Sequence, residues 1–513
     1  MSQEKLDLRL APAALSAWGA AAVGVGWSPS HAVVGALALL GASALALLVR
    51  SRRATPPTGG TGSSGRLVAA VAVMVAAGAL GVSGLRAGAI QAGPVPDLAR
   101  DRAHVEVSAV VDSDPRLREG KFAPYVVVRV NARKVTGRGE TTRVRSPLLV
   151  IGDRSWMSVH VGDHVQADGR LQVAQGPDLS GVLMGHDAPQ VTAPAGLVDR
   201  VVGRVRAGLV EAAQPLPAAE QALVPALVDG DDSTMPEQVA DDFRTTGLTH
   251  LLAVSGSNLT LVLGFVLFVA RWCGVRAYGL RVVGLCAVVF FVLLARPEPS
   301  VLRAAAMGVV ALAGMSAGGR RRGIRALCVA VVVLVLLDPW LARSVGFLLS
   351  SLATAGILVL APRWRAAMSR WMPAILAEAV AVPLAAQLAC IPVIAAFSGR
   401  VSLVAVLANL LAAPAVGPTT VLGLVAGLLA TASAALGHLC GYLAGVPAWW
   451  IIWVAQHAAG LEGASMTWPV GVPAIAGLTI LCLAIVLLLP RVLRHRSASL
   501  CVVSLLVLAV LHP

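Results

Sequence analysis

The residues with the greatest chemical potential lie in the stretch GLTHLLAVSGSNLTLV, residues 247–262, where His250, Ser255, Ser257 and Asn258 fall within nine residues. A histidine near a serine could activate a nucleophile if the two side chains share a hydrogen bond. The stretch is otherwise apolar enough to enter a membrane, where polar groups are costly. The same residues could instead line a pathway or join neighbouring helices.

Helical geometry argues against catalysis in this stretch. On one continuous helix Ser255 lies roughly 140° from His250, so the two side chains could not form a nucleophilic pair. Gly256 could break the helix and change this arrangement, and an intramembrane serine protease stays open as an alternative. Its usual Gly-x-Ser-Gly motif would need glycine where this chain has Ala253. We predict no catalytic residue and expect helix packing or pathway lining.

Three further polar residues lie within apolar runs. Glu378 has a carboxyl at a depth where such groups are usually functional or paired. Arg303 is near the start of a run and could reach the outer interface. Asn409 precedes Pro414, and discontinuous helices with polar residues are common at translocation sites. The candidate pathway residues are His250, Ser255, Ser257, Asn258, Arg303, Glu378 and Asn409.

Several motifs of enzymes are absent from the sequence. There is no G-x-x-x-x-G-K-[ST] loop for a nucleotide and no H-E-x-x-H or clustered ligand set for zinc. We therefore expect no cofactor, no metal and no enzymatic activity. Energy for transport would come from a partner or a gradient.

The elements that position these residues are mostly membrane spans. Of the 513 residues, 57% are hydrophobic and only 13% are charged, with a mean hydropathy of +0.77. A soluble core cannot absorb that much apolar surface, so we predict a polytopic α-helical membrane protein. The net charge of +14 is mostly explained by basic residues in cytoplasmic loops. None of the seven cysteines forms a C-x-x-C pair.

Apolar runs divide the chain into four regions. Residues 1–86 hold three helices, and residues 247–513 hold about ten spans. These lie near 249–270, 280–295, 300–317, 324–338, 344–361, 374–396, 403–430, 434–459, 471–490 and 499–512, the 403–430 run being a candidate for a broken or re-entrant helix. The basic loops all become cytoplasmic if the N-terminus is cytoplasmic and the C-terminus is outside.

Residues 87–200 form a different kind of domain, with alternating apolar and polar residues. HVEVSAVV, YVVVRVNARKV, SPLLVIG and DHVQADGRLQVA are typical of strands, with turns expected at Gly162 and Gly169. We predict an inserted extracytoplasmic small β-barrel, with an OB-like fold as the leading candidate. From Arg116 to Arg145 there are nine Lys or Arg and two Asp or Glu. The candidates for contact with a DNA backbone are Arg129, Arg133, Lys134 and Arg138, although a solvated charged face explains the charge equally well.

A connector at residues 201–246 joins this domain to the channel region. VVGRVRAGLVEAA, with Arg204 and Arg206, is typical of a short interfacial helix. Six acidic residues follow within fourteen positions, between Asp229 and Asp242. Such a run could collect a divalent cation, but it is more often a solvated loop.

Four spaced segments carry a family resemblance. GLTHLLAVSGSNLTLV, together with the ALVDGDDSTMPEQVADDFRTT before it, closely resembles the signature of the ComEC competence proteins, the inner-membrane DNA channels of natural transformation. ARPEPSVLRAAAMG, DPWLARSVGFLLSSLATAGI and SGRVSLVAVLANLLAAPAVGP resemble later elements of the same family, in the expected order. The resemblance covers residues about 210–490 and, more loosely, the N-terminal helices and the β-domain.

The resemblance implies transport of single-stranded DNA across the cytoplasmic membrane. It also implies an OB-like domain outside the membrane, a DNA-receptor protein that delivers DNA and a cytoplasmic ATP-driven motor. Many relatives have His where this chain has Asn258, and many have a C-terminal metallo-β-lactamase-like domain that this sequence does not contain. A separate nuclease would then degrade the other strand. A small-molecule or lipid-linked transporter is the first alternative function.

Overall fold

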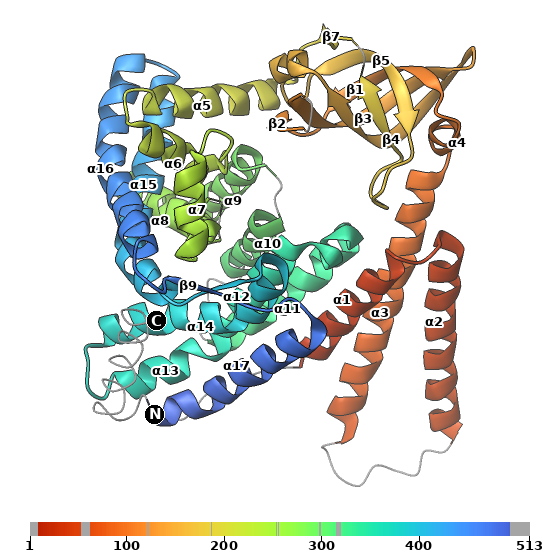
Figure 1. Ribbon diagram of the computed structural model, residues 1–513. Coiled ribbons are helices and arrows are strands. Elements are labelled where there is room, and N and C mark those ends of the chain that lie inside the picture. The colour runs from red at the N-terminus through yellow and green to blue at the C-terminus, as the bar shows by residue number, and fades with distance from the viewer. Residues whose placement is uncertain are drawn as a thin grey trace. The chain divides into compact units, whose positions relative to one another are not determined.

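The computed structural model describes residues 9–52, 62–120, 123–185, 187–252, 254, 256–296, 299–313 and 320–492. The chain, shown in Figure 1, folds into two compact units. The sheet unit comprises Ala11–Arg204 and Val332–Ala342, and the helical unit comprises Val205–Val331 and the described residues from Arg343 onward. The β-strands of the predicted domain all belong to the sheet unit.

Three apolar helices begin the sheet unit, α1 (Ala11–Gly24), α2 (Pro29–Arg52) and α3 (Gly62–Gln91), and α4 (Val95–Arg100) follows. Small residues let α2 and α3 approach closely, since a Cβ on Gly84 would lie 2.9 Å from the Cβ of Ala32. Ser16 on α1 donates a hydrogen bond of 2.9 Å to the carbonyl of Ala72 on α3. The N-terminal helices therefore pack as one group, as close packing of apolar helices requires.

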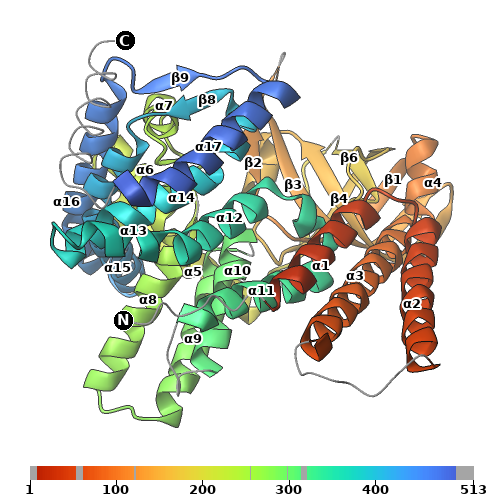
Figure 2. The ribbon, with the colours of Figure 1, turned by 90° about the horizontal axis from the view of Figure 1, so that it is seen from below.

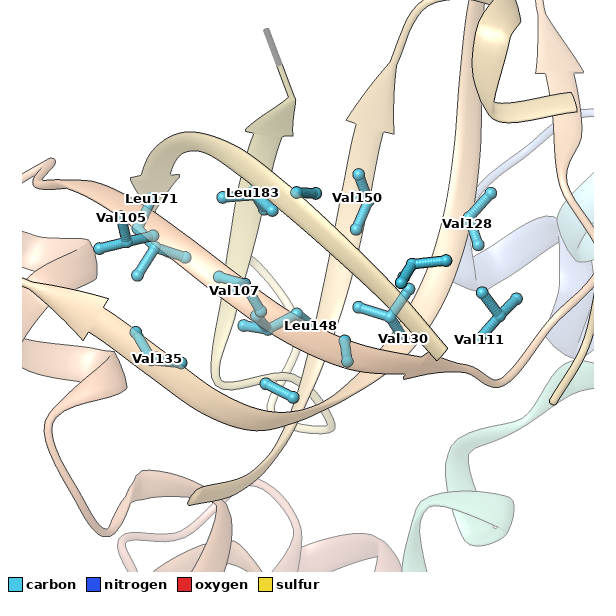
Figure 3. Packing of buried hydrophobic residues seen from close by; sticks show 14 of the residues in the cluster. Val105, Val107, Val111, Val128, Val130, Val135, Leu148, Val150, Leu171 and Leu183 are labelled. Atoms are coloured by element: carbon cyan, nitrogen blue, oxygen red, sulfur yellow. The ribbon is translucent and has the colours of Figure 1, made fainter. Parts of the chain in front are cut away.

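Seven strands form the sheet of this unit. They are β1 (His104–Val111), β2 (Arg116–Arg118), β3 (Tyr125–Gly137), β4 (Glu140–Gly152), β5 (His164–Gln172), β6 (Gly181–Gly185) and β7 (Gln190–Ala193), with the 3₁₀ turn η1 (Arg154–Ser158) after β4. Buried and outward side chains alternate along the four longer strands, as a half-buried sheet requires. The inward valines and leucines make one apolar core, shown in Figure 3.

The pairing order places strands that are distant in sequence side by side. The order is β1-β3-β4-β6-β5-β7, and β1 also pairs with β5. β4 and β6 run parallel, whereas the other pairs are antiparallel. The four strands predicted from alternation are present as β1, β3, β4 and β5. The turn expected at Gly169 is wrong because Gly169 lies inside β5, where a Cβ would come within 2.3 Å of the carbonyl oxygen of Met184 on β6.

The helical unit contains the remaining long helices. In chain order the elements are α5 (Leu197–Ala213), which begins in the sheet unit, α6 (Ala218–Asp229), α7 (Glu237–Thr245), η2 (Thr249–Leu251), α8 (Gly256–Trp272), α9 (Tyr278–Leu294), α10 (Pro299–Ala313), α11 (Arg320–Leu337), η3 (Pro339–Arg343), α12 (Val345–Val359), α13 (Ala361–Met368), α14 (Ala374–Ser398), β8 (Arg400–Ser402), α15 (Ala405–Ala430), α16 (Ala434–Ala459), β9 (Ser465–Thr467) and α17 (Val472–Val492). The end of α11 and most of η3 belong to the sheet unit.

Six helices in the described residues are long and apolar enough to cross a membrane. They are Val68–Gln91, Val345–Met368, Ala374–Ser398, Ala405–Ala430, Ala434–Ala459 and Val472–Val492, and five shorter apolar helices accompany them. Large apolar side chains on α16 and α17, such as Leu439 and Leu487, face outward from the packed chain. Lipid is the solvent that such surfaces require, so the chain is a multi-pass membrane protein.

The candidate for a broken span is a single helix. α15 continues from Ala405 to Ala430 although it contains Pro414 and Pro418. The two prolines leave the carbonyls of Leu410 and Pro414 without their intrahelical N–H donors, which membrane helices tolerate where neighbouring groups compensate. The last expected span, 499–512, lies outside the described residues.

Candidate functional site

The stretch 247–262 changes conformation twice and is not one helix. Gly247 follows α7 with a φ of +69°, a conformation that favours glycine. The 3₁₀ turn at Thr249–Leu251 comes next, and α8 begins only at Gly256. The continuous helix assumed from the sequence is therefore wrong, and the angle between His250 and Ser255 that it implied does not apply. Ser255 lies outside the described residues, and so does the side chain of Ser257.

His250 lies on the surface of the 3₁₀ turn. Its Nδ1 is 3.2 Å from the carbonyl oxygen of Gly247, so the imidazole closes the turn on its own backbone. The side chain is exposed.

Asn258, in the first turn of α8, is fully buried. Its Nδ2 donates a hydrogen bond of 2.8 Å to the carbonyl oxygen of Leu227 near the end of α6. An amide side chain that satisfies a backbone carbonyl across a helix pair ties the two helices together. The geometry of Asn258 thus supports the helix-packing interpretation of this residue more directly than the pathway interpretation.

Arg303 on α10 is the most deeply buried guanidinium described in the helical unit, with 6% of its surface exposed. Its Nε donates to Ser350 Oγ at 2.8 Å, and its Nη1 donates to Thr354 Oγ1 at 2.6 Å, both on α12. Nη1 also lies 3.5 Å from the sulfur of Met307. Among the described residues no carboxylate pairs with Arg303, so neutral hydroxyls hold a buried cation in place.

Glu378 and Asn409 make local contacts. Glu378 is exposed in the second turn of α14, and its Oε2 is 3.2 Å from Nε of Arg365 on α13. Asn409 is half-buried, and its Nδ2 donates to the carbonyl of Ala405 in its own helix at 2.8 Å. The structure therefore brings neither residue together with His250, Asn258 or Arg303 through any described hydrogen bond.

A buried ion pair near residues 247–262, which we call the entry stretch, is a feature that sequence reasoning missed. Nη1 of Arg206 on α5 is 3.1 Å from Oδ2 of Asp229 at the end of α6, and both side chains are largely buried. The same Nη1 donates to the carbonyl of Leu294 at the end of α9 at 2.9 Å. A cation near the last carbonyls of a helix also interacts favourably with its dipole. The sequence did show Arg206 within a largely apolar helix, but residue spacing does not reveal that Asp229 is its partner.

The acidic run is divided among separate partners. Asp229 pairs with Arg206, and Asp241 lies 3.9 Å from both Arg244 and Arg400. Within the described ranges no three His, Cys, Asp or Glu side chains are grouped closely enough to hold a metal ion. Burial, and next the neighbouring charge of Asp241, raise the pKa of the Asp242 carboxyl.

The four basic candidates of the sheet divide into two kinds. Arg129 pairs with Asp178 at 2.8 Å, and Arg138 pairs with Asp101 at 2.7 Å. Arg133 and Lys134 are exposed at the bulge of β3, and no ion pair of theirs occurs among the described residues. Lys134 lies directly opposite Arg143 of β4, and Arg145 is exposed beside them.

Like charges placed opposite each other in a sheet destabilise it. Arg133, Lys134, Arg143 and Arg145, which we call the bulge cluster, therefore have the arrangement expected of an anion-binding surface. Sequence reasoning found half of this cluster, and strand register supplied the other half.

The part of the chain that is similar to a known protein family lies mostly in the helical unit. The chain is 29% identical over 225 residues to ComE operon protein 3 of Bacillus subtilis (strain 168), an alignment that covers 44% of this chain and 28% of that relative. No solved structure matches the chain. The family described as "Competence protein" matches residues 227–494, which include the entry stretch, Arg303 and the helices from α8 to α17. Because that match extends over more than half of the sequence, the chain belongs to the competence protein family.

Proposed function

We propose that this chain passes single-stranded DNA inward across the cytoplasmic membrane during natural transformation. The match of the competence family to residues 227–494, the polytopic part of the chain, is the observation that carries the proposal. The relative in Bacillus subtilis takes its name from the ComE operon, and the chain aligns with only 28% of it. Uptake of DNA by this chain is therefore a proposal drawn from family membership and from the surfaces described above.

The sheet domain supplies a surface suited to a nucleic-acid backbone. The bulge cluster presents exposed cations on two paired strands, and phosphate contacts dominate sequence-independent binding of DNA. An OB-like identity is supported by the pairing order, in which β1 contacts both β3 and β5, and by the parallel pair β4–β6. We propose that this domain lies outside the membrane and guides the strand toward the helical unit.

The proposal requires other components. Lipid surrounds the apolar helices, a DNA receptor outside delivers the strand, and an ATP-driven motor in the cytoplasm pulls it. A separate nuclease removes the other strand. These partners are proposed from the family resemblance, and so is the assignment of the chain as a channel without enzymatic activity.

Deletion of the gene in a competent host tests the function. The expected result is normal binding of DNA at the cell surface with a loss of transformation, restored by the wild-type gene. Unchanged transformation would instead favour a small-molecule or lipid-linked transporter. The serine protease alternative depends on Ser255, so restoration by Ser255→Ala at wild-type efficiency would dismiss it for DNA uptake.

A further inference from the structure

Two helix N-termini meet beside the guanidinium of Arg303. Ser300, the second residue of α10, donates through Oγ to the carbonyl of Val254 at 2.8 Å, two residues before α8 begins. A Cβ on Gly256, the first residue of α8, would lie 3.2 Å from Nη2 of Arg303. The beginnings of α8 and α10 and the free edge of the guanidinium therefore share one small region of the helical unit.

This arrangement is electrostatically incomplete. The N-terminus of a helix has the positive end of its dipole and several N–H groups without intrahelical partners. A guanidinium placed there is a third positive element, and a buried charge is stable only when it is paired. No carboxylate reaches Arg303 among the described residues, because its partners are Ser350, Thr354 and Met307. Among the described residues, this region therefore contains no anion to balance its positive charges.

The hydroxyls of α12 orient the guanidinium rather than neutralise it. Ser350 accepts from Nε and Thr354 accepts from Nη1, whereas Nη2 has no hydrogen-bond partner in the described residues. Nη2 is the nitrogen that lies against the start of α8. Glycine at position 256 leaves the space that a side chain would take from a ligand of Nη2.

We propose that Arg303 and the N-termini of α8 and α10 bind a phosphodiester anion. Nη2 of Arg303 donates to a non-bridging oxygen, and N–H groups at the helix ends supply further donors, as they do for phosphates at other helix N-termini. The identification of this anion with the backbone of the transported strand rests on the proposed function. A phospholipid headgroup carries the same chemistry, so the test has one arm for each source.

The strand arm uses the full chain in nanodiscs of phosphatidylcholine and fluorescein-labelled (dT)20. Anisotropy titrations at several salt concentrations give the dependence of affinity on salt. Each lost phosphate contact on a single strand lowers the slope of log K against log salt by about 0.7. Arg303→Gln is expected to show this decrease, while Arg303→Lys, which keeps the charge, retains most of the slope. Gly256→Ala is expected to weaken binding because its Cβ would lie 3.2 Å from Nη2; the same Cβ would lie 3.0 Å from Cβ of Ala304, so the folding of this variant is checked as well.

The folding of each variant is checked separately by thermal unfolding. If Arg303→Gln fails to fold, the double variant Ser350→Ala with Thr354→Val replaces it. This double variant keeps the charge of Arg303 but removes the two hydroxyls that orient the guanidinium. The expected result for this pair is weaker binding with an unchanged slope. Equal affinity for wild type and for all folded variants would overturn the strand assignment.

The lipid arm uses nanodiscs that contain phosphatidylglycerol and measures by mass spectrometry the lipid retained after transfer to detergent. Retention by wild type but not by Arg303→Gln, with no effect on DNA affinity, assigns the site to a headgroup. If Arg303→Gln changes neither the retention of lipid nor the affinity for DNA, the phosphodiester site itself is overturned. Failure of the proposed function appears differently, as wild-type protein that binds no (dT)20 at low salt.

Discussion

At the scale of single residues, Asn258 and Arg206 show how polar groups are kept inside an apolar helical unit. Asn258 satisfies a carbonyl of α6, and Arg206 joins α5 to the ends of α6 and α9. In each case a polar side chain replaces water for a backbone group near a helix terminus. These contacts fix the helices around the entry stretch, and they make its position sensitive to single substitutions.

Asn258→Ala is expected to destabilise the helical unit. The change removes the bond to the carbonyl of Leu227 and leaves that buried oxygen without its donor, a loss of about 1–3 kcal/mol. Thermal unfolding of the detergent-purified chain measures the effect. Thr260→Val is the matched control, because Thr260 is exposed and bonds only to its own helix. Equal midpoints for the two variants would contradict the tie between α8 and α6.

Arg206→Ala is expected to be far more harmful than Arg244→Ala. Removing Arg206 takes away the cation 3.1 Å from the buried carboxylate of Asp229, and breaking a buried ion pair by removing one partner costs about 3–5 kcal/mol. Arg244 forms an exposed pair with Asp241, and such pairs contribute about 0–1 kcal/mol. Urea unfolding of both variants checks the contrast. Partial recovery of stability in Arg206→Ala with Asp229→Asn would identify the buried negative charge of Asp229 as the cause, and no recovery would exclude it.

At the scale of elements, register decides which cations of the sheet are available. Replacing Arg133 and Lys134 by Gln is expected to lower the affinity of the full chain for single-stranded DNA and to reduce its salt slope by about 1.4, for two lost phosphate contacts. Arg138→Gln is the control because Arg138 already pairs with Asp101. Fluorescence anisotropy at several salt concentrations gives both quantities. A larger effect from Arg138→Gln would move the binding surface away from the bulge cluster.

The helix α7 has a carboxyl whose ionisation opposes folding. Burial, and then repulsion from Asp241, raise the pKa of Asp242 above its ordinary value of 3.8, so the folded state binds the proton more tightly than the unfolded chain. The stability linked to that proton is present at low pH and is lost as pH rises through the folded pKa. Asp242→Asn is therefore expected to raise the unfolding midpoint at pH 7, with no gain below pH 3.8. A gain that is equal at all pH values would exclude ionisation as its source.

The same elements show what sequence can and cannot predict. Strict alternation revealed β1, β3, β4 and β5, but β6 and β7 are too short to give a pattern. Gly169 suggested a turn because glycine is common there, whereas the structure uses it for the close approach of β6. Polar residues in apolar runs indicated Arg303 and Asn258 as candidates, and the structure buries both side chains. Their partners, Ser350 and Leu227, lie on other helices and depend on packing that no local pattern encodes.

At the scale of the whole molecule, the two-stranded β-ribbon of β8 and β9 constrains the arrangement of the last helices in the membrane. β8 follows α14 and β9 follows α16, and the two strands pair antiparallel, as Figure 2 shows. The α14–α15 and α16–α17 connections therefore lie on the same side of the helical unit. The basic segment between α12 and α14, with Arg363, Arg365 and Arg370, lies at the other end of α14. Positive residues favour the cytoplasmic side, so the ribbon is expected outside.

Cysteine labelling in intact cells tests this orientation for the whole chain. In a background without the seven native cysteines, Glu462→Cys near the ribbon and Thr141→Cys in the sheet are expected to react with a membrane-impermeant maleimide. Arg370→Cys is expected to react only after the cells are permeabilised, because basic segments favour the cytoplasmic side. The opposite pattern at Glu462 and Arg370 would show that the helical unit has the opposite orientation in the membrane. Protection of Thr141 with labelling of Glu462 would place the bulge cluster in the cytoplasm, where it could not receive DNA arriving from outside.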